Sequence, residues 1–314
     1  MIRLNPVDRI SGRLQLPGDK SISHRAALIA ALAAGGSEIT NFSTARDCGS
    51  TVACLRELGV SIMQADETLI FAGGQKLVAP SRPLDCGNSG STLRILTGVL
   101  AGHDLTAELI GDESLSSRPM RRIIEPLELM GAKIESTDGR APLRVHGSSK
   151  LTPINYKLPI ASAQVKSAIL FAGLNANGRT TVIETSPSRD HTERLFNGFG
   201  VPVQTHDDLS VVIDGPAHLT GGRMAIPGDV SSAAYFVALA MLLPGSDVTI
   251  ERVGLNPTRA AFLDVLRSWG AEISVTDVQS ERNEPFGTIH VRGGINREAG
   301  EAERTLSGAQ IPAL

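Results

Sequence analysis

The chain has 314 residues, of which 41% are hydrophobic and only 4% aromatic, so it can bury a large aliphatic core and has the length of about two domains. Its formal net charge of −3 gives no overall attraction to nucleic acid or to an anionic membrane, so any anion site must be local. The three cysteines form no CxxC pair, the histidines form no metal motif, and no apolar run has the length of a signal peptide or a membrane span. These features predict a cytoplasmic protein without a bound metal.

The first informative stretch is residues 17–25, PGDKSISHR, which leads into an Ala- and Leu-rich run. A Pro-Gly turn followed by small hydroxyl residues predicts a helix start, where Ser21 or Ser23 would cap the free N–H groups. Lys20 and Arg25 would then converge with these N–H groups on one anion, a phosphate or a carboxylate. The alternative is a capped helix with two solvated cations. The stretch is not a Walker loop, because Asp19 precedes Lys20 where that loop has glycine.

A repeat of about 70 residues runs along the chain. Four amphipathic segments each end in a glycine that is followed by an alternating strand, at Gly59, Gly131, Gly200 and Gly270. Each is preceded by a helix that begins in small polar residues and by a β-rich stretch, at residues 37–40, 105–110, 180–183 and 247–250. The pattern predicts an α/β fold built from repeated units of strand, helix, strand, helix and further strands.

The fourth unit is followed by charged stretches at residues 279–282 and 296–304, which we expect to form a linker. The repeat interval predicts a fifth helix near residue 301 or later, but the chain stops at residues 311–314, IPAL. We therefore expect a truncated chain. The alternative is that four units are the whole protein and the rest is a frayed polar tail.

Three successive units combine a helix N-terminus rich in small donors with at least one cation. Repeated units that pack side by side would bring these ends to one surface and form a site for small polyanions. Arg118 is the most informative of the cations, because Pro119 fixes the backbone that follows it. We expect Arg121 and Arg122 to be solvated charges. Asp190 and Glu193 are candidates for acid–base roles, but beside Arg189 and Arg194 we expect ion pairs. For His24 and His191 the alternatives are structural hydrogen bonds and proton transfer.

Together these stretches resemble one enzyme family. The matching motifs are PGDKSISHR at 17–25, GNSG at 87–90, RPM at 118–120, ASAQVKSA at 161–168, SRDHTE at 188–193, GDVSSAAYF at 228–236 and NPTR at 256–259. In this combination and order they are similar to the 3-phosphoshikimate 1-carboxyvinyltransferases (EPSP synthases). The resemblance implies an enolpyruvyl transferase fold of two similar domains, each of three βαβαββ units in an inverse α/β barrel-like arrangement. It places a complete domain at residues 15–224 and an incomplete second domain at residues 1–14 plus 225–314.

The resemblance also implies a reaction. The enolpyruvyl group of phosphoenolpyruvate would pass to the 5-hydroxyl of shikimate 3-phosphate with release of phosphate, a step toward chorismate and the aromatic amino acids that glyphosate inhibits in this family. It implies no cofactor, no partner other than these two small substrates, and a monomer. A related UDP-N-acetylglucosamine enolpyruvyl transferase is a weaker alternative, because residues 116–119, SSRP, stand where that enzyme has a reactive cysteine loop.

The resemblance also implies which residues contact the two substrates. By resemblance, Lys20 would contact both substrates, and Ser21 and Arg25 would hold shikimate 3-phosphate. Gly90 and Arg118 would line the phosphoenolpyruvate site. Lys166 would be an additional cation or a charge on a solvated helix face. At the phosphate of shikimate 3-phosphate the resemblance places Ser162, Ala163 and Arg189, and it has Gln164 touch both substrates. Ala163 departs from the serine of many relatives.

The catalytic acid is not among these residues. In the family an acidic residue follows the position of Leu314, so its counterpart would lie beyond the chain as given, and we expect this chain to be inactive or nearly so. A further alternative, from another functional class, is a non-catalytic anion-binding fragment.

Overall fold

The computed structural model describes residues 6–295. The chain forms two compact units, one of residues 20–226 and one that joins the residues up to Asp19 to those from Pro227 onward. The fifth helix expected near residue 301, the linker at residues 296–304 and the chain end at residues 311–314 lie outside the described residues.

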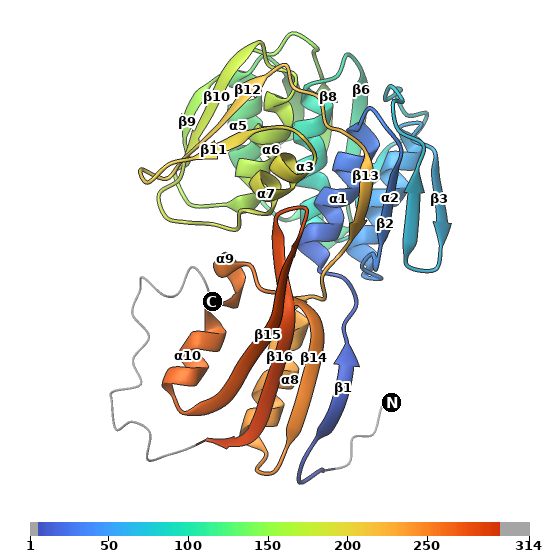
Figure 1. Ribbon diagram of the computed structural model, residues 1–314. Coiled ribbons are helices and arrows are strands. Elements are labelled where there is room, and N and C mark those ends of the chain that lie inside the picture. The colour runs from blue at the N-terminus through green and yellow to red at the C-terminus, as the bar shows by residue number, and fades with distance from the viewer. Residues whose placement is uncertain (1–5, 296–314) are drawn as a thin grey trace. The chain divides into compact units, whose positions relative to one another are not determined.

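The unit of residues 20–226 contains three copies of one arrangement (Figure 1). Its helices are α1 (Lys20–Leu32), α2 (Arg46–Glu57), α3 (Gly90–Ala101), α4 (Glu113–Ser116), α5 (Arg121–Leu129), α6 (Ala163–Gly173) and α7 (His191–Gly198). Its strands are β2 (Ser37–Thr40), β3 (Ile62–Ala65), β4 (Thr68–Phe71), β5 (Leu84–Asp85), β6 (Thr106–Ile110), β7 (Lys133–Thr137), β8 (Arg140–His146), β9 (Asn155–Lys157), β10 (Gly178–Ile183), β11 (Val203–Thr205), β12 (Ser210–Gly215) and β13 (Gly222–Ala225).

The strands of this unit form three sheets with the same topology. Their orders are β13-β2-β4-β3, β5-β6-β8-β7 and β9-β10-β12-β11. In each sheet the first pair is parallel and the other two pairs are antiparallel. The repeated α/β unit expected from the sequence is therefore confirmed. The first sheet takes its parallel edge strand, β13, from the far end of the unit.

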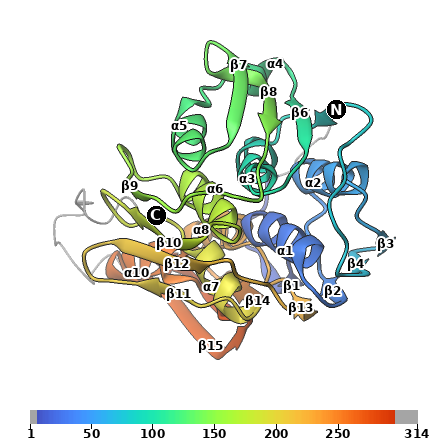
Figure 2. The ribbon, with the colours of Figure 1, turned by 90° about the horizontal axis from the view of Figure 1, so that it is seen from above.

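Three helices form the centre of this unit. Figure 2, which looks down on it, shows α1, α3 and α6 near one another in the middle with the three sheets around them. These helices are apolar and buried over most of their length, as expected of helices enclosed on all sides. Their close approach needs small residues, because a Cβ atom at Gly98 of α3 would lie 2.2 Å from the carbonyl oxygen of Ala168 in α6. Backbone contact thus fixes the distance between α3 and α6.

The second unit contains one further copy. Strands β1 (Ser11–Gln15), β14 (Asp247–Gly254), β16 (Glu284–Ile295) and β15 (Ala271–Glu281) form a sheet in that order, with β1 parallel to β14. Helix α8 (Val230–Leu242) packs on β14 and β16, and α9 (Pro257–Ala260) and α10 (Phe262–Ser268) follow β14 (Figure 1). Its own apolar core joins α8 to the sheet through residues such as Val237, Ile250 and Ile289.

The helix boundaries agree with the sequence signals. Gly59, Gly131, Gly200 and Gly270 all have positive φ, between 86° and 106°, so each closes its helix in the left-handed conformation as predicted. Ser89, Ser162 and Asp229 cap α3, α6 and α8 through their side chains. The expectation that Ser23 caps α1 is wrong, because Ser23 lies inside the helix and its hydroxyl accepts a hydrogen bond from the Ser43 N–H.

The linker expected at residues 279–282 is also wrong. Residues 271–281 and 284–295 form a long antiparallel hairpin, β15–β16, in which Glu281 pairs with Glu284. The two turn residues, Arg282 and Asn283, both have positive φ, 49° and 67°, which is the geometry of a type I′ turn. The charged stretch is therefore the tip of a hairpin.

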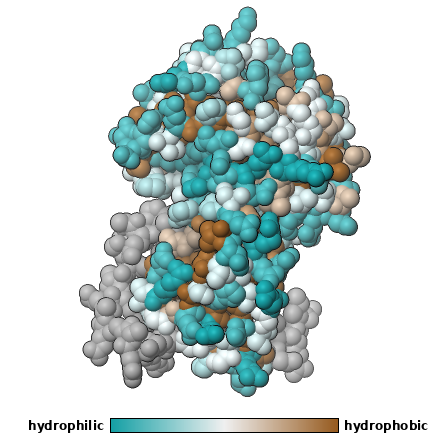
Figure 3. Space-filling view, viewed as in Figure 1, coloured by the Kyte–Doolittle hydropathy of each residue, from teal (hydrophilic) through white to brown (hydrophobic). Residues whose placement is uncertain are grey.

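The surface of the unit of residues 20–226 is largely polar. On the face that Figure 3 shows, hydrophilic side chains predominate in this unit and apolar ones are scattered among them. Among the described residues, no helix is both long and apolar enough to cross a lipid bilayer.

We expect the substitution Gly98→Ala to lower the free energy of unfolding by about 3 kcal/mol or more, because the new methyl group overlaps the backbone of α6. Urea unfolding followed by circular dichroism measures this change. Gly49→Ala, in the exposed part of α2, is the matched control: nothing lies within 4 Å of its Cβ position, so alanine should stabilise the helix by roughly 0.5–1 kcal/mol. Equal effects of the two substitutions would contradict the close α3–α6 contact.

Candidate anion-binding site

The first cations of the candidate site stand at the start of α1. Lys20 is exposed, and its ammonium lies 3.0 Å from Asp47 Oδ2. Arg25, one turn further on, is 3% exposed. The proximity of Lys20 and Arg25 that the sequence predicts follows from their common helix, but of the two only Lys20 is exposed.

Arg25 is held by oxygen atoms from three segments. Its Nε donates to Thr192 Oγ1 at 2.7 Å, its Nη2 to Ser167 Oγ at 2.8 Å, and its Nη1 to the carbonyl oxygen of Ser21 at 2.9 Å. Ser167 and Thr192 also bond to each other at 2.7 Å. These bonds join α1 to α6 and α7 and hold the guanidinium in one orientation.

Arg189 stands next to this cluster. Its Nη1 donates to Ser21 Oγ at 3.4 Å, and the residue is exposed. The hydroxyl of Ser21, which was expected to cap α1, therefore accepts from Arg189. The structure thus brings together Ser21, Arg25 and Arg189, three residues that the resemblance assigns to shikimate 3-phosphate.

A second group of cations lies at the start of α3. Arg94 Nη1 donates to Gln164 Oε1 at 2.7 Å, and Gln164 Nε2 donates to Ser91 Oγ at 2.9 Å. These two bonds link the first turn of α3 to the first turn of α6. They also fix the orientation of the Gln164 amide, because its oxygen faces a cation and its nitrogen faces a hydroxyl.

Arg118 approaches the same place from the loop after α4. Its Nη2 donates to Asn88 Oδ1 at 2.6 Å and to Ser114 Oγ at 3.3 Å. Gly90 lies beneath both arginines, since a Cβ atom there would be 2.7 Å from Arg94 Nη1 and 3.2 Å from Arg118 Nη1. The absence of a side chain at position 90 is therefore what lets the two guanidinium groups come so close.

A hollow of about 290 Å³ opens beside these groups. Arg94, Arg118 and Arg122 line it together with Ser162 and Gln164. Burial, and then the nearby charges of Arg118 and Arg122, lower the pKa of Arg94 below its ordinary value. A pocket with three mutually repelling cations and neutral hydrogen-bonding groups favours an anionic ligand.

The start of α6 connects the two groups. Ser162 caps this helix through the Val165 N–H, and the carbonyl oxygen of Ala163 accepts a hydrogen bond from Ser167 Oγ at 2.6 Å. Ser167 bonds Arg25 and Gln164 bonds Arg94, so one helix end contacts both cation groups. All nine residues that the resemblance assigns to substrates lie in the unit of residues 20–226.

Lys166 corrects one expectation. It does not lie on a solvated helix face: its side chain is 1% exposed, and its ammonium lies 2.6 Å from Glu184 Oε2 and 2.7 Å from Glu193 Oε1. Burial alone would lower the pKa of Lys166, but the two carboxylates outweigh it and raise that pKa. Burial raises the pKa of Glu193 more than Lys166 lowers it.

Asp190, Glu193 and His24 make structural contacts. Asp190 pairs with Arg194 at 2.8 Å, as expected, whereas Glu193 pairs with Lys166 rather than with an adjacent arginine. His24 is buried with its Nδ1 2.7 Å from Thr51 Oγ1, which is a structural role. Among the described residues no three His, Cys, Asp or Glu side chains could hold a metal ion, and the three cysteines are free and buried.

Sequence reasoning missed Glu184 altogether. It follows β10, where Thr180, Val182 and Glu184 alternate on the buried side. A carboxylate at an inward position of an alternating strand is a usable signal, because such a charge must find a buried partner. Arg94, Ser167 and Thr192 lay within the quoted motifs or beside them but carried no assigned role.

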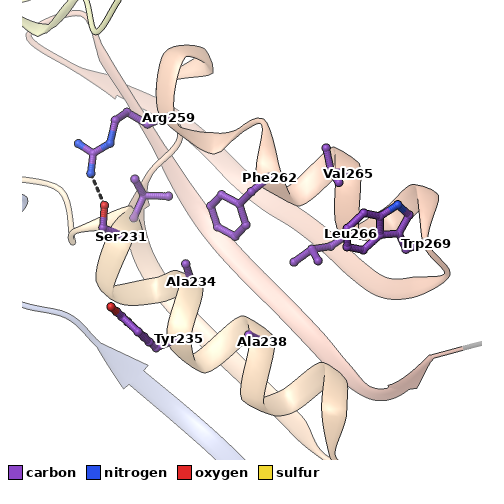
Figure 4. A pocket seen from close by; sticks show the side chains of 10 residues that line it. Ser231, Ala234, Tyr235, Ala238, Arg259, Phe262, Val265, Leu266 and Trp269 are labelled. Atoms are coloured by element: carbon purple, nitrogen blue, oxygen red, sulfur yellow. Dashed lines mark hydrogen bonds between the residues drawn. The ribbon is translucent and has the colours of Figure 1, made fainter. Parts of the chain in front are cut away.

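A larger groove, of about 560 Å³, lies in the other unit between α8 and α10 (Figure 4). Its walls are mostly apolar, with Tyr235, Phe262 and Trp269 among them. Its cation, Arg259, donates to Ser231 Oγ and is paired with Asp19 and Asp229. This groove has the wrong chemistry for a small polyanion.

Comparison with known proteins agrees with this geometry. Residues 4–296 match the family described as EPSP synthase (3-phosphoshikimate 1-carboxyvinyltransferase). Relatives named 3-phosphoshikimate 1-carboxyvinyltransferase from Bacillus licheniformis and Geobacillus kaustophilus are 45% and 48% identical to the chain, in each case over 98% of this chain and 71% of the relative. A solved structure of EPSP synthase from Acinetobacter baumannii superimposes with a TM-score of 0.89 at 39% identity, covering 97% of this chain and 68% of that chain.

The raised pKa of Glu193 gives a pH-dependent prediction. When a carboxyl group binds its proton more tightly in the folded state than in the unfolded state, the free energy of unfolding falls as pH rises above the group's ordinary pKa, here 4.5. We therefore expect the free energy of unfolding of the unsubstituted chain to fall, relative to Glu193→Gln, between pH 4.5 and neutral pH. Urea unfolding at several pH values measures this.

The control is Glu135→Gln, which removes an exposed carboxylate whose pKa is lowered by Lys133. The free energy of unfolding of the unsubstituted chain, relative to Glu135→Gln, should change little with pH and should rise rather than fall as pH rises, because the pKa of this carboxyl group is lowered in the folded state. Parallel pH profiles for the chain and for Glu193→Gln would contradict the assignment.

Proposed function

This chain belongs to the EPSP synthase family, and from that membership we propose that it transfers the enolpyruvyl group of phosphoenolpyruvate to the 5-hydroxyl of shikimate 3-phosphate, with release of phosphate. The observation that carries the proposal is the convergence of two arginine groups on the N-terminal end of α6, through Ser167 and Gln164. Two anionic substrates that must react with each other require such a pair of adjacent cationic subsites.

Shikimate 3-phosphate is assigned to the first group. We propose that Lys20, Ser21, Arg25 and Arg189 hold it together with the start of α6, where Ser162, Ala163 and Gln164 offer a hydroxyl, a backbone N–H and an amide. Support comes from the contacts of Arg189 and Arg25 with Ser21, and from the free donors that a helix N-terminus presents to a phosphate. Ala163 offers only its backbone there.

Phosphoenolpyruvate is assigned to the second group. Arg118 and Gly90 would line this subsite, with Gln164 between the two substrates and Lys20 reaching both. The hollow beside Arg94, Arg118 and Gln164 supports this assignment. The side chains that orient the two arginines, Gln164 and Asn88, are neutral, so they do not cancel the positive charge of the hollow. A negative charge that grows on the leaving phosphate would be stabilised by the same guanidinium groups. The acid that protonates the methylene carbon is not assigned to any described residue.

Three further properties are proposed with the function. The unit of residues 20–226 would be one domain and the residues up to Asp19 and from Pro227 onward would belong to a second. The protein would act in the cytoplasm, where free thiols such as its three buried cysteines remain reduced. It would act as a monomer, as the resemblance implies.

Calorimetric titration with shikimate 3-phosphate tests the first subsite. We expect saturable binding that Arg25→Ala or Gln164→Ala weakens by about tenfold or more, since each removes a hydrogen bond to a charged group. Arg179→Ala is the matched control, because Arg179 is exposed and pairs with Asp214 on neighbouring strands. UDP-N-acetylglucosamine should not bind. A folded chain that binds the UDP-sugar in preference to shikimate 3-phosphate would overturn the proposal.

Gly90→Ala tests the second subsite. The added methyl group would lie 2.7 Å from Arg94 Nη1 and 3.2 Å from Arg118 Nη1, so both guanidinium groups must shift away from α3. We expect the affinity for phosphoenolpyruvate, measured in the presence of shikimate 3-phosphate, to fall by about tenfold, and the affinity for shikimate 3-phosphate alone to stay within about twofold. Equal losses for both ligands would show that position 90 acts on the fold and not on this subsite.

A further inference from the structure

The Lys166 cluster, which consists of Lys166, Glu184 and Glu193, has no part in the function proposed above. The side chains of Lys166, Glu184 and Glu193 are 1%, 5% and 4% exposed, so the lysine ammonium cannot touch a substrate in the site. Its distances to the two carboxylates are 2.6 and 2.7 Å. The cluster therefore consists of three ionisable side chains buried together in the unit of residues 20–226.

Such a cluster is not explained by stability. Removing three charges from water is costly, and well-packed apolar residues in the same place are often as stabilising or more so. A buried ion cluster does, however, impose geometry, because an ammonium between two carboxylates restricts the segments that carry them to one arrangement. Here those segments are α6, the end of β10 and α7.

Each member of the cluster is adjacent to a group of the candidate phosphate site. Lys166 precedes Ser167, and Glu193 follows Thr192; Ser167 and Thr192 are the two hydroxyl residues that hold the Arg25 guanidinium. One main-chain step thus separates the buried charges from the bonds that orient Arg25.

The third member of the cluster, Glu184, is connected to Arg189. Glu184 Oε1 accepts a hydrogen bond of 2.5 Å from Ser188 Oγ, and Ser188 directly precedes Arg189. Glu184 Oε2 is the atom bound to Lys166, so the loop that carries Arg189 is tied through one carboxylate to α6. The cluster therefore reaches both arginines that lie beside Ser21.

We propose that Lys166 is a positioning residue for recognition of the phosphorylated substrate: through Glu193 and Glu184 it sets the placement of Arg25 and Arg189 relative to the start of α6. This inference rests on the proposed function, because the substrate it names is shikimate 3-phosphate. Lys166 acts through other residues and makes no contact with the ligand itself.

Calorimetric titration of the full chain with shikimate 3-phosphate tests the proposal. We expect Lys166→Met, which keeps the side-chain volume and removes the charge, to weaken binding by about tenfold or more. Ser188→Ala, a smaller change that leaves the buried charges in place, should weaken binding by about three- to tenfold. If Lys166→Met does not fold, Ser188→Ala and Glu193→Gln decide the question.

A double-mutant cycle separates positioning from structure. If Ser188 acts by placing Arg189, Ser188→Ala should have less than about a twofold effect in an Arg189→Ala background. The stability control is Leu143→Ala in β8, a fully buried site in another sheet of the same unit, which should destabilise the chain and leave its affinity within about twofold.

Two results would overturn the proposal: folded Lys166→Met and Ser188→Ala variants with unchanged affinity, or an equal loss of affinity in Leu143→Ala. If the unsubstituted, folded chain does not bind shikimate 3-phosphate at all, the proposed function fails, and this inference fails with it. Additive losses in the Ser188 and Arg189 cycle would likewise exclude positioning through Arg189.

Discussion

The candidate site depends on keeping like charges close together; Lys20 pairs with the Asp47 carboxylate, whereas the hydrogen bonds given above for Arg25, Arg94 and Arg118 go to neutral oxygen acceptors. Arg94 is held by an amide, Arg118 by an amide and a hydroxyl, and Arg25 by two hydroxyls and a carbonyl. A carboxylate in these places would orient the arginines equally well, but it would cancel the positive charge that an anionic ligand needs. Neutral acceptors fix direction and leave the charge available. Arg94 shows the cost: burial, and then repulsion by Arg118 and Arg122, lower its pKa.

The carboxylates are placed one layer deeper. Glu184 and Glu193 surround Lys166 beneath the hydroxyls that hold Arg25, so this buried group combines two carboxyl groups with one amine. Burial is the main cause that raises the pKa of Glu193, and the nearby Asp190 carboxylate adds to it. The two layers therefore have different roles in the proposed site: the inner group joins α6 to α7, and the outer arginines supply positive charge next to the start of α6. Substitutions in the two layers should consequently differ in how they affect stability and affinity.

The sequence predicted those parts of the fold that local chemistry controls. A helix that ends in a left-handed residue needs glycine, so the repeat was visible at Gly59, Gly131, Gly200 and Gly270 and the positive φ values confirm it. The β15–β16 hairpin was missed because its turn, Arg282–Asn283, lacks the glycine that usually marks a type I′ turn and its tip is charged. Within the site, motif residues could be assigned by resemblance, but the Lys166 cluster could not, since its members lie 9 to 27 positions apart and meet only after α6, β10 and α7 pack together. Long-range partners of a buried charge are set by tertiary packing, which periodicity does not report.

The 70-residue repeats and the two compact units have different boundaries, because two edge strands pair with sheets of other repeats. In the second and third sheets, the parallel edge strand directly precedes the first helix of the same repeat. The first and fourth sheets exchange these strands: β1, which precedes α1, joins the fourth sheet, and β13, which precedes α8, joins the first. The chain consequently passes between the units twice, after Asp19 and after Ile226. Within the unit that contains them, the residues at these passages are bonded to one another: the Asp19 N–H donates to the carbonyl oxygen of Pro227, and the Asp19 carboxylate lies 3.0 Å from Arg259. Asp19 is thus a buried part of its own unit, and the first cation of the proposed site, Lys20, is the first residue of the other unit.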